Sequence, residues 1–439
     1  MSRFTVPVTR VGRQDLSGIA VKLGMRGKME SGSVIDAVTG ILEGVRSRGD
    51  EAVAEYTGRF DRVDLNPAQF RVTEAEIDSA MAETDPAVLD ALRQAADNVF
   101  AFHRDGVPTG YTRDDGQGAV TGVIVRPLDT VGVYVPGGTA SLPSSVLMNL
   151  LPARAAGVRR VVMCTPPRPD GSVAPVILAA ARVAGADEIY KIGGAQAIAA
   201  MAYGTATVPR VDKVCGPGNL YVNTAKRLVF GQVDIDLFAG PSEILVIADC
   251  TADPDFLAAD LLSQAEHLMA SAILVTDDEE TAQQVAERVR ARAEKLPRQD
   301  LLERSLADYA AILLAPDLDT AVDFANELAP EHLEICTEDP EKLLPRIVNA
   351  GAVFLGAYSP EPLGDYFAGP NHVLPTSGTA RFFSPLNATD FVKRINVIHY
   401  SREALAACRD QVVALAEAEE LWAHAEAVKA RFEKGADEA

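Results

Sequence analysis

The sequence predicts an α/β protein built from two consecutive units with parallel sheets. The chain has 439 residues, which exceeds one ordinary hydrophobic core and favours two or three packing units. From residue 125 onward, short apolar runs typical of strands alternate with runs of helical periodicity, as in parallel sheets with crossover helices. Hydrophobic residues make up 48% of the chain. The sequence contains no run of 18 apolar residues, so no membrane span is expected.

The first α/β unit is expected over residues 125–240. Its expected strands are 130–135, 160–164, 188–192 and 211–215, and its expected helices are 144–156, 174–183 and 195–203. Each strand is short and apolar, and each is followed by a glycine-containing or proline-containing turn. The pattern therefore predicts a sheet that is covered by helices.

The second α/β unit is expected after residue 240. Its expected strands are 243–248, 271–276, 310–314 and 333–337, and its expected helices are 254–267, 279–295 and 321–328. Residues 15–106 show helical spacing without a catalytic signature. Residues 401–439 are rich in Ala and Glu, which predicts one or two helices. Such a tail must dock on the body or on another subunit, because it cannot bury an apolar face alone.

Charge and cysteine content narrow the function classes. A net charge of −21 argues against nucleic-acid binding, because a phosphate backbone would be repelled. The five cysteines include no CxxC, which argues against both a disulfide framework and a cysteine zinc knuckle. The polar segment Met1–Gln14 lacks the apolar region of a secretory signal. We therefore expect a cytoplasmic protein.

Glycine-rich turns follow three of the expected strands, at residues 135–138, 192–196 and 215–219. Such turns let the backbone approach a ligand, and the helix that follows offers free N–H groups to phosphate. None of them is a complete G-x-G-x-x-G, and no acidic residue clearly ends a second strand about 20 residues further on. The turns predict either a nucleotide site or ordinary strand-to-helix connections.

Two pairs of polar residues lie on expected helices. Gln264 and His267 are three residues apart, so both would project from one helix face. This histidine could bind a metal or interact with the carbonyls at the helix end, and glutamine is an unusual zinc ligand. Glu419 and His424 are five residues apart, about 140° around a helix, and spacing alone would not select them.

Two further segments combine a carboxylate with a histidine. Glu331 and His332 come just before an expected strand, where both side chains could reach one cleft. A histidine near neutral pKa would be a suitable base for an alcohol proton, although a surface Glu and a hydrogen-bonded His are equally consistent with the pattern. Asp365 lies in a loop that is dense in Gly, Pro and Asn and ends at His372. That loop could carry function or be an ordinary long connection.

Many segments of this chain, in order from about Val34 to Arg431, resemble the histidinol dehydrogenase family. The segments that carry the resemblance are 131–138, 143–149, 191–197, 215–219, 239–243, 263–267, 329–332, 364–365, 369–375 and 390–394.

The resemblance implies specific residue roles. Zinc would be held by Gln264, His267, Asp365 and His424, the last supplied by the tail of the other subunit. Substrate would contact Ser242, Gln264, His267, His332, Asp365, Glu419 and His424. NAD would contact Tyr134, Gln196 and Asn219. Glu331 and His332 would be the pair that handles protons.

The resemblance also implies a fold and a reaction. The fold would be a homodimer of two incomplete Rossmann-like domains with an N-terminal arm and an exchanged helical C-terminal tail. The arm would be 1–23, the zinc domain 24–124 with 241–386, the NAD domain 125–240 and the tail 387–439. The reaction would be four-electron oxidation of L-histidinol to L-histidine through bound L-histidinaldehyde, the last steps of histidine biosynthesis.

Two departures from the family pattern keep an alternative open. The residues after His267, namely Leu268–Ser271, and Glu420 in the tail differ from what is common in the family. Both changes lie beside expected zinc ligands rather than on them. The alternative is a related dehydrogenase that oxidises another small alcohol, such as a sulfonated diol.

Overall fold

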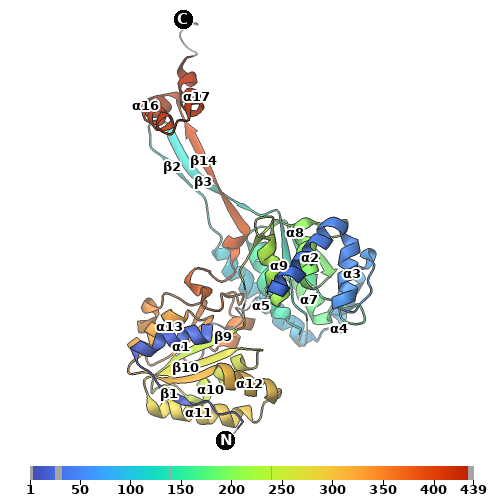
Figure 1. Cartoon of the computed structure of the whole chain (residues 1–439), viewed down its shortest axis with the longest axis vertical. Coiled ribbons are helices and arrows are strands. Elements are labelled where there is room, and N and C mark those ends of the chain that lie inside the picture. Colours follow the sequence, from blue (N-terminus) through green and yellow to red (C-terminus); the bar gives the residue numbers. More distant parts are fainter. Residues whose placement is uncertain (1–2, 25–31, 138–140, 239, 434–439) are drawn as a thin grey trace. The chain divides into compact units, whose positions relative to one another are not determined.

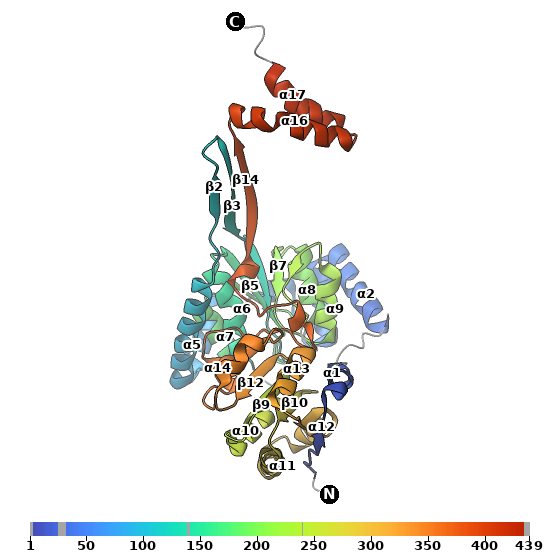
Figure 2. The same ribbon diagram turned by 90° about the vertical axis from the view of Figure 1, so that its left-hand side faces the viewer.

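The structure, a computed structural model, describes residues 3–24, 32–137, 141–238 and 240–433. It confirms the predicted α/β class with parallel sheets (Figures 1 and 2). The chain forms two compact units, Met1–Val107 with Leu128–Phe391, and Pro108–Pro127 with Val392–Ala439. Gly138 and Ala239, which belong to two of the motifs, lie outside the described residues. None of the described helices has the length and apolar character that a membrane crossing requires.

A five-stranded parallel sheet forms one half of the larger unit. Its strands are β4 (Thr130–Tyr134), β5 (Arg160–Thr165), β6 (Glu188–Lys191), β7 (Lys213–Cys215) and β8 (Asp234–Ile235). Their spatial order is β6-β5-β4-β7-β8, and every neighbouring pair is parallel. The order reverses direction between β4 and β7. Ligands bind at such a switch point, beyond the carboxyl ends of the strands.

Helices cover both faces of this sheet. The connecting helices are α6 (Pro143–Ala155), α7 (Pro175–Ala184), α8 (Gly194–Tyr203) and α9 (Leu220–Val229). The N-terminal helices are α2 (Gly32–Arg48), α3 (Asp50–Phe60), α4 (Glu74–Glu83) and α5 (Pro86–Asp105). Helices α2 and α3 pack on α8, whereas α4 and α5 pack on α7 and α6.

The position of α2–α5 differs from the expected division, which grouped residues 24–124 with 241–386. The buried side chains of Val38 and Tyr56 share one core with Val162 and Ile198 of the five-stranded half. The apolar faces of these helices thus complete the core of the sheet that carries the glycine turns. Helical periodicity alone does not show which sheet a helix will cover.

A six-stranded parallel sheet forms the other half of the larger unit. Its strands are β1 (Val8–Arg10), β9 (Glu243–Ala248), β10 (Ser271–Thr276), β11 (Ala310–Leu314), β12 (His332–Cys336) and β13 (Ala352–Leu355). They are arranged in the order β1-β11-β10-β9-β12-β13. Strand β9 is buried on both faces: Ile244 and Val246 belong to one core cluster, and Leu245 and Ile247 to the other. Its position explains its continuous apolar sequence.

Aspartate N-caps begin three helices of this half. The helices on one face are α10 (Pro254–Ala265), α11 (Glu279–Ala293) and α12 (Gln299–Tyr309), and those on the other are α1 (Leu16–Gly24) and α13 (Leu318–Leu328). Asp253, Asp278 and Asp317 each accept a backbone N–H in the first turn of α10, α11 and α13. Two short helices, α14 (Pro340–Leu343) and α15 (Glu361–Tyr366), follow.

The smaller unit combines a sheet with two helices. Strands β2 (Tyr111–Asp114), β3 (Ala119–Pro127) and β14 (Val392–Tyr400) form an antiparallel sheet in the order β14-β3-β2. Helices α16 (Arg402–Ala418) and α17 (Trp422–Glu433) follow β14. The expectation of a wholly helical tail from residue 387 is therefore wrong, because β14 pairs with β3 along its entire length.

Candidate active site

The end of helix α10 brings Gln264 and His267 together. The helix ends at Ala265, so His267 lies in the turn beyond it, and its N–H donates to the Gln264 carbonyl at 3.1 Å. The Gln264 side chain is fully buried, and its Nε2 lies 3.4 Å from His267 Nδ1. The prediction that both side chains project from one helix is wrong, because His267 lies beyond the helix end. The two side chains are nevertheless neighbours.

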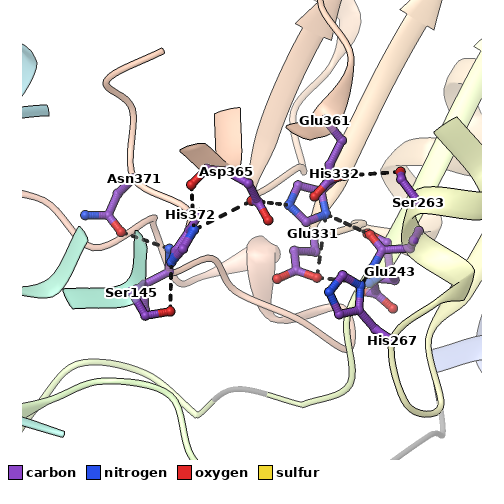
Figure 3. A network of polar contacts seen from close by, with 12 residues as sticks. Ser145, Glu243, Ser263, His267, Glu331, His332, Glu361, Asp365, Asn371 and His372 are labelled. Atoms are coloured by element: carbon purple, nitrogen blue, oxygen red, sulfur yellow. Dashed lines mark hydrogen bonds and ion pairs between the residues drawn. The ribbon is translucent and has the colours of Figure 1, made fainter. Parts of the chain in front are cut away.

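The ring of His332, the first residue of β12, is at the centre of the site (Figure 3). Its Nδ1 lies 3.2 Å from the Glu243 carbonyl oxygen and 3.2 Å from Gln264 Oε1. Because both atoms are acceptors, Nδ1 carries the proton and Nε2 keeps its lone pair. Nε2 is buried, has no hydrogen-bond partner among the described residues, and lies 3.9 Å from Asp365 Oδ1. It is therefore positioned to accept a proton.

Glu331 lies beside this ring. Its Oε2 accepts a hydrogen bond from the Glu243 N–H at 2.9 Å and lies 3.7 Å from His332 Nδ1. Burial raises the pKa of Glu331 well above its ordinary value and lowers the pKa of His332 to about 3. The latter is far below the near-neutral pKa expected from the sequence. His332 is consequently uncharged at neutral pH.

Helix α15 contributes two carboxyl groups. Burial raises the pKa of Asp365 to about 6, and burial together with the nearby Asp365 raises the pKa of Glu361 to about 8. One ligand atom from each of His332, Glu361 and Asp365 lies within 4.8 Å of the others. Glu361 was not among the site residues expected from the sequence. Its spacing of four residues before Asp365, on one face of a helix, is the signal that could have found it.

His372 connects this group to the five-stranded half. Its Nδ1 donates to the Asp365 carbonyl at 3.0 Å, and its Nε2 lies 3.3 Å from Ser145 Oγ on α6. Burial lowers the pKa of His372 to about 4, so it too is uncharged at neutral pH. The loop that was singled out for its turn-forming residues therefore packs against the site.

The donor set fits a bound divalent cation. Glu331, Glu334, Glu361 and Asp365 are largely buried, and none forms an ion pair with Lys or Arg within the described ranges. Ionised carboxylates without a cation are costly to bury. Of the expected zinc ligands, Asp365 belongs to the converging group, whereas His267 does not, and Gln264 and His267 lie at the end of α10. Imidazole and carboxylate are usual ligand types of zinc.

The expected NAD residues line one cavity of about 960 Å³ at the switch point of the five-stranded sheet. Tyr134 ends β4, and its hydroxyl accepts the Gly194 N–H at 3.1 Å. Gln196 is fully buried on α8. Asn219 is the N-cap of α9. The structure thus brings together three residues that are up to 85 positions apart in the sequence.

A buried ion pair fixes the loop between β7 and α9. Asp236 accepts the Gly216 N–H at 2.7 Å and forms an ion pair with Lys226, and both side chains are almost fully buried. Lys226 Nζ donates to the carbonyls of Gly216 and Leu237, each at 2.9 Å. Gly216 has φ of +115°, and a Cβ there would lie 2.0 Å from the Tyr134 carbonyl oxygen. Only glycine fits this position.

Three expected substrate contacts remain. Ser242 is half-buried just before β9, and its carbonyl accepts the Ser271 N–H at 3.1 Å. Glu419 is the C-cap of α16, and His424 lies on α17. Between them Glu420 has φ of +57°, so the expected 140° separation around one helix does not apply. Both residues are exposed in the smaller unit, which is described by itself.

Comparisons with known proteins agree over nearly the whole chain. The family profile described as Histidinol dehydrogenase matches residues 25–432. A histidinol dehydrogenase of Heliobacterium mobile is 54% identical over 407 residues, which cover 92% of this chain and 95% of that protein. One from Listeria innocua is 52% identical over 405 residues, covering 92% and 94%. The crystal structure of histidinol dehydrogenase from Elizabethkingia anophelis superimposes with a TM-score of 0.92 at 36% identity, covering 98% of each chain.

Proposed function

The chain belongs to the histidinol dehydrogenase family, and on this premise we propose that it oxidises L-histidinol to L-histidine through bound L-histidinaldehyde with two molecules of NAD. The observation that carries the proposal is the state of His332: the ring is buried and neutral, and its Nε2 has no hydrogen-bond partner among the described residues. The carboxyl groups around it have no Lys or Arg partner in the described part of the chain. A neutral ring of this kind can accept the proton of a substrate alcohol. The five free cysteines are consistent with a reducing cytoplasm.

We propose that one zinc ion per subunit is held by Gln264, His267 and Asp365, together with His424 of the partner subunit. Zinc at this position supplies positive charge that polarises the substrate alcohol. That charge also favours the ionised forms of the nearby carboxyl groups, whose pKa values burial raises in the chain alone. Three neutral ligands and one carboxylate leave the site with net positive charge.

In the first oxidation, Nε2 of His332 accepts the alcohol proton while the carbinol carbon gives a hydride to the first NAD. The hydrogen bond from Nδ1 to the Glu243 carbonyl keeps the ring in the required tautomer. The aldehyde stays bound, which prevents loss of a reactive intermediate. Once His332 has passed its first proton to solvent, Glu331 accepts a proton from a water that adds to the aldehyde, and His332 accepts the hydroxyl proton of the hydrate as the hydrate gives its hydride to the second NAD.

Substrate is positioned by groups of the six-stranded half of the larger unit and by the tail. We assign contacts with substrate to Ser242, Gln264, His267, His332 and Asp365, and to the tail residues Glu419 and His424. We assign NAD to the cavity that Tyr134, Gln196 and Asn219 line. The tail residues would act across a homodimer, in which each active site is completed by a second copy of the chain.

The yield of NADH per histidinol tests the proposed reaction. We expect two NADH for each histidine formed. One NADH with release of an aldehyde would contradict the four-electron reaction. NADH formation with a sulfonated diol and none with histidinol would show that the alternative substrate class is correct.

Mixed dimers test the shared site. The His267→Ala and His424→Ala variants should each lose zinc and activity. When they are mixed, one site per dimer keeps both intact ligands, so part of the activity should return. Each variant re-mixed with itself is the matched control. No recovery in verified mixed dimers would contradict an exchanged tail.

A further inference from the structure

The five-stranded half has no acidic residue at the place where dinucleotide-binding units usually carry one. In such units an Asp or Glu at the carboxyl end of the second strand accepts hydrogen bonds from the adenosine ribose. The order β6-β5-β4-β7-β8 makes β4 the first strand and β5 the second. Strand β5 ends at Thr165 and is followed by Pro166-Pro167-Arg168-Pro169, which contains no carboxylate.

The structure brings a carboxylate to this place from another element. Asp61 directly follows α3 and lines the same cavity as Tyr134 and Gln196. A Cβ built on Gly193, just after β6, would lie 3.1 Å from Asp61 Oδ1 and 2.6 Å from the Pro166 side chain. Asp61 therefore lies against the carboxyl ends of both β5 and β6.

The partners of Asp61 leave its charge available to a ligand. Its Oδ2 accepts a hydrogen bond from Gln196 Nε2 at 3.4 Å, and within the described ranges it forms no ion pair with Lys or Arg. Burial raises its pKa to about 6. Two arginines also line the cavity, and the guanidinium of one, Arg59, lies over the Phe60 ring at 5.3 Å from its centroid. Among the described residues Oδ1 has no hydrogen-bond partner, and Asp61 lines the cavity.

We propose that Asp61 accepts hydrogen bonds from the adenosine ribose hydroxyls of the cofactor and thereby selects NAD against its 2′-phosphorylated form. Gln196 orients the carboxylate by its hydrogen bond. A 2′-phosphate would place like charge beside Asp61 and would also remove a hydroxyl donor. This inference rests on the proposed function, because that function assigns the cavity to NAD.

Binding of NADH and of NADPH to the full-length protein tests the proposal without histidinol. Wild-type protein should bind NADH more tightly than NADPH. Asp61→Asn keeps the size of the side chain but removes its charge, so NADH affinity should fall about tenfold to a hundredfold, as expected for one charge-assisted hydrogen bond. NADPH affinity should fall less or rise, so the ratio of NADH affinity to NADPH affinity should decrease.

Two further variants control the result. Asp64→Asn makes the same change of net charge at an exposed residue outside the cavity and should leave both affinities unchanged. Asp61→Glu retains the charge and should keep the discrimination against NADPH even if NADH binds less tightly. If a folded Asp61→Asn variant has the same ratio of NADH affinity to NADPH affinity as wild type, the inference is overturned.

The two proposals fail separately. If wild-type protein binds NADH but does not oxidise histidinol, the proposed reaction fails while the role of Asp61 is still tested by binding. If histidinol yields two NADH and Asp61→Asn discriminates like wild type, only the role of Asp61 fails.

Discussion

The two halves of the larger unit differ in whether their buried charged groups have partners of opposite charge. Beside the five-stranded sheet, the buried ammonium groups of Lys226 and Lys213 pair with Asp236 and Asp234. Beside the six-stranded sheet, buried carboxyl groups gather around His332 with no Lys or Arg partner in the described part of the chain. Paired charges can stay ionised in the interior, whereas unpaired carboxyl groups retain protons.

The difference shows which site the folded chain completes by itself. The Lys226–Asp236 pair already holds the Gly216 loop beside the proposed NAD cavity. The carboxyl-rich site has raised pKa values at Glu331 and Glu361, as expected for a place that still lacks positive charge. We therefore regard the proposed NAD cavity as preformed and the second site as complete only with a cation.

Replacing His332 with Gln should cause the largest loss. The variant keeps a hydrogen-bonding side chain but has no group that can accept the alcohol proton. The turnover number should fall about a hundredfold to ten-thousandfold, the usual contribution of a general base. Metal content and NADH affinity should remain at the wild-type level, which separates this loss from damage to either binding site. A turnover number within threefold of wild type would rule out His332 as the base.

Replacing Lys226 with Met should destabilise the protein through the five-stranded half, where the buried charges are paired. Asp236 would then be buried without a cation, so the free energy of unfolding should fall by about 3–5 kcal/mol, as measured by urea denaturation.

The exposed Lys342–Asp339 pair provides the matched control, because Lys342→Met should leave the free energy of unfolding nearly unchanged. Adding Asp236→Asn to Lys226→Met should restore much of the lost stability, since it removes the buried charge. A single Lys226→Met variant as stable as the control would contradict the importance of the pair.

Raising the pH should destabilise the metal-free protein through Asp260 and Glu334. Their carboxyl groups are hydrogen-bonded to each other, and burial raises the pKa of Asp260 to about 6 and that of Glu334 well above its ordinary value. The folded state therefore binds protons more tightly than the unfolded state. Stability is greatest below the unfolded pKa and falls as the pH rises toward and through the folded pKa, by on the order of 1–3 kcal/mol.

Urea denaturation at about pH 5 and about pH 7.5 measures this slope. Asp260→Asn removes one of the two titrating groups, so the slope should become smaller. The same slope in wild type and variant would exclude this pair as its source.

Local sequence predicted much of the fold because its strands are buried on both faces. Strands β9 and β10 match their expected bounds, since each has a continuous apolar run of at least four residues. Strand β1 was missed because it has only three residues, and its identity depends on pairing with the distant β11. Strand β14 was missed for the same reason, because its partner β3 is more than 250 residues earlier in the chain.

The candidate site was predictable where its residues carry a local signal. Glu331 and His332 adjoin a strand, and Asp365 lies in a loop dense in turn formers. The proposed role of Asp61 could not be predicted from the sequence. Asp61 directly follows a helix, whereas the acidic residue of a dinucleotide-binding unit usually follows the second strand. Long-range packing, rather than spacing, brings such groups together.

Zinc titration of the metal-free protein by calorimetry tests the central contrast most directly. We expect one zinc per chain, with release of protons from the carboxyl groups whose pKa values are raised. Asp365→Asn should weaken zinc binding at least tenfold, whereas NADH affinity should not change. If the metal-free protein takes up no zinc, or if Asp365→Asn binds zinc as tightly as wild type, the carboxyl-rich site does not await a cation and the account is contradicted.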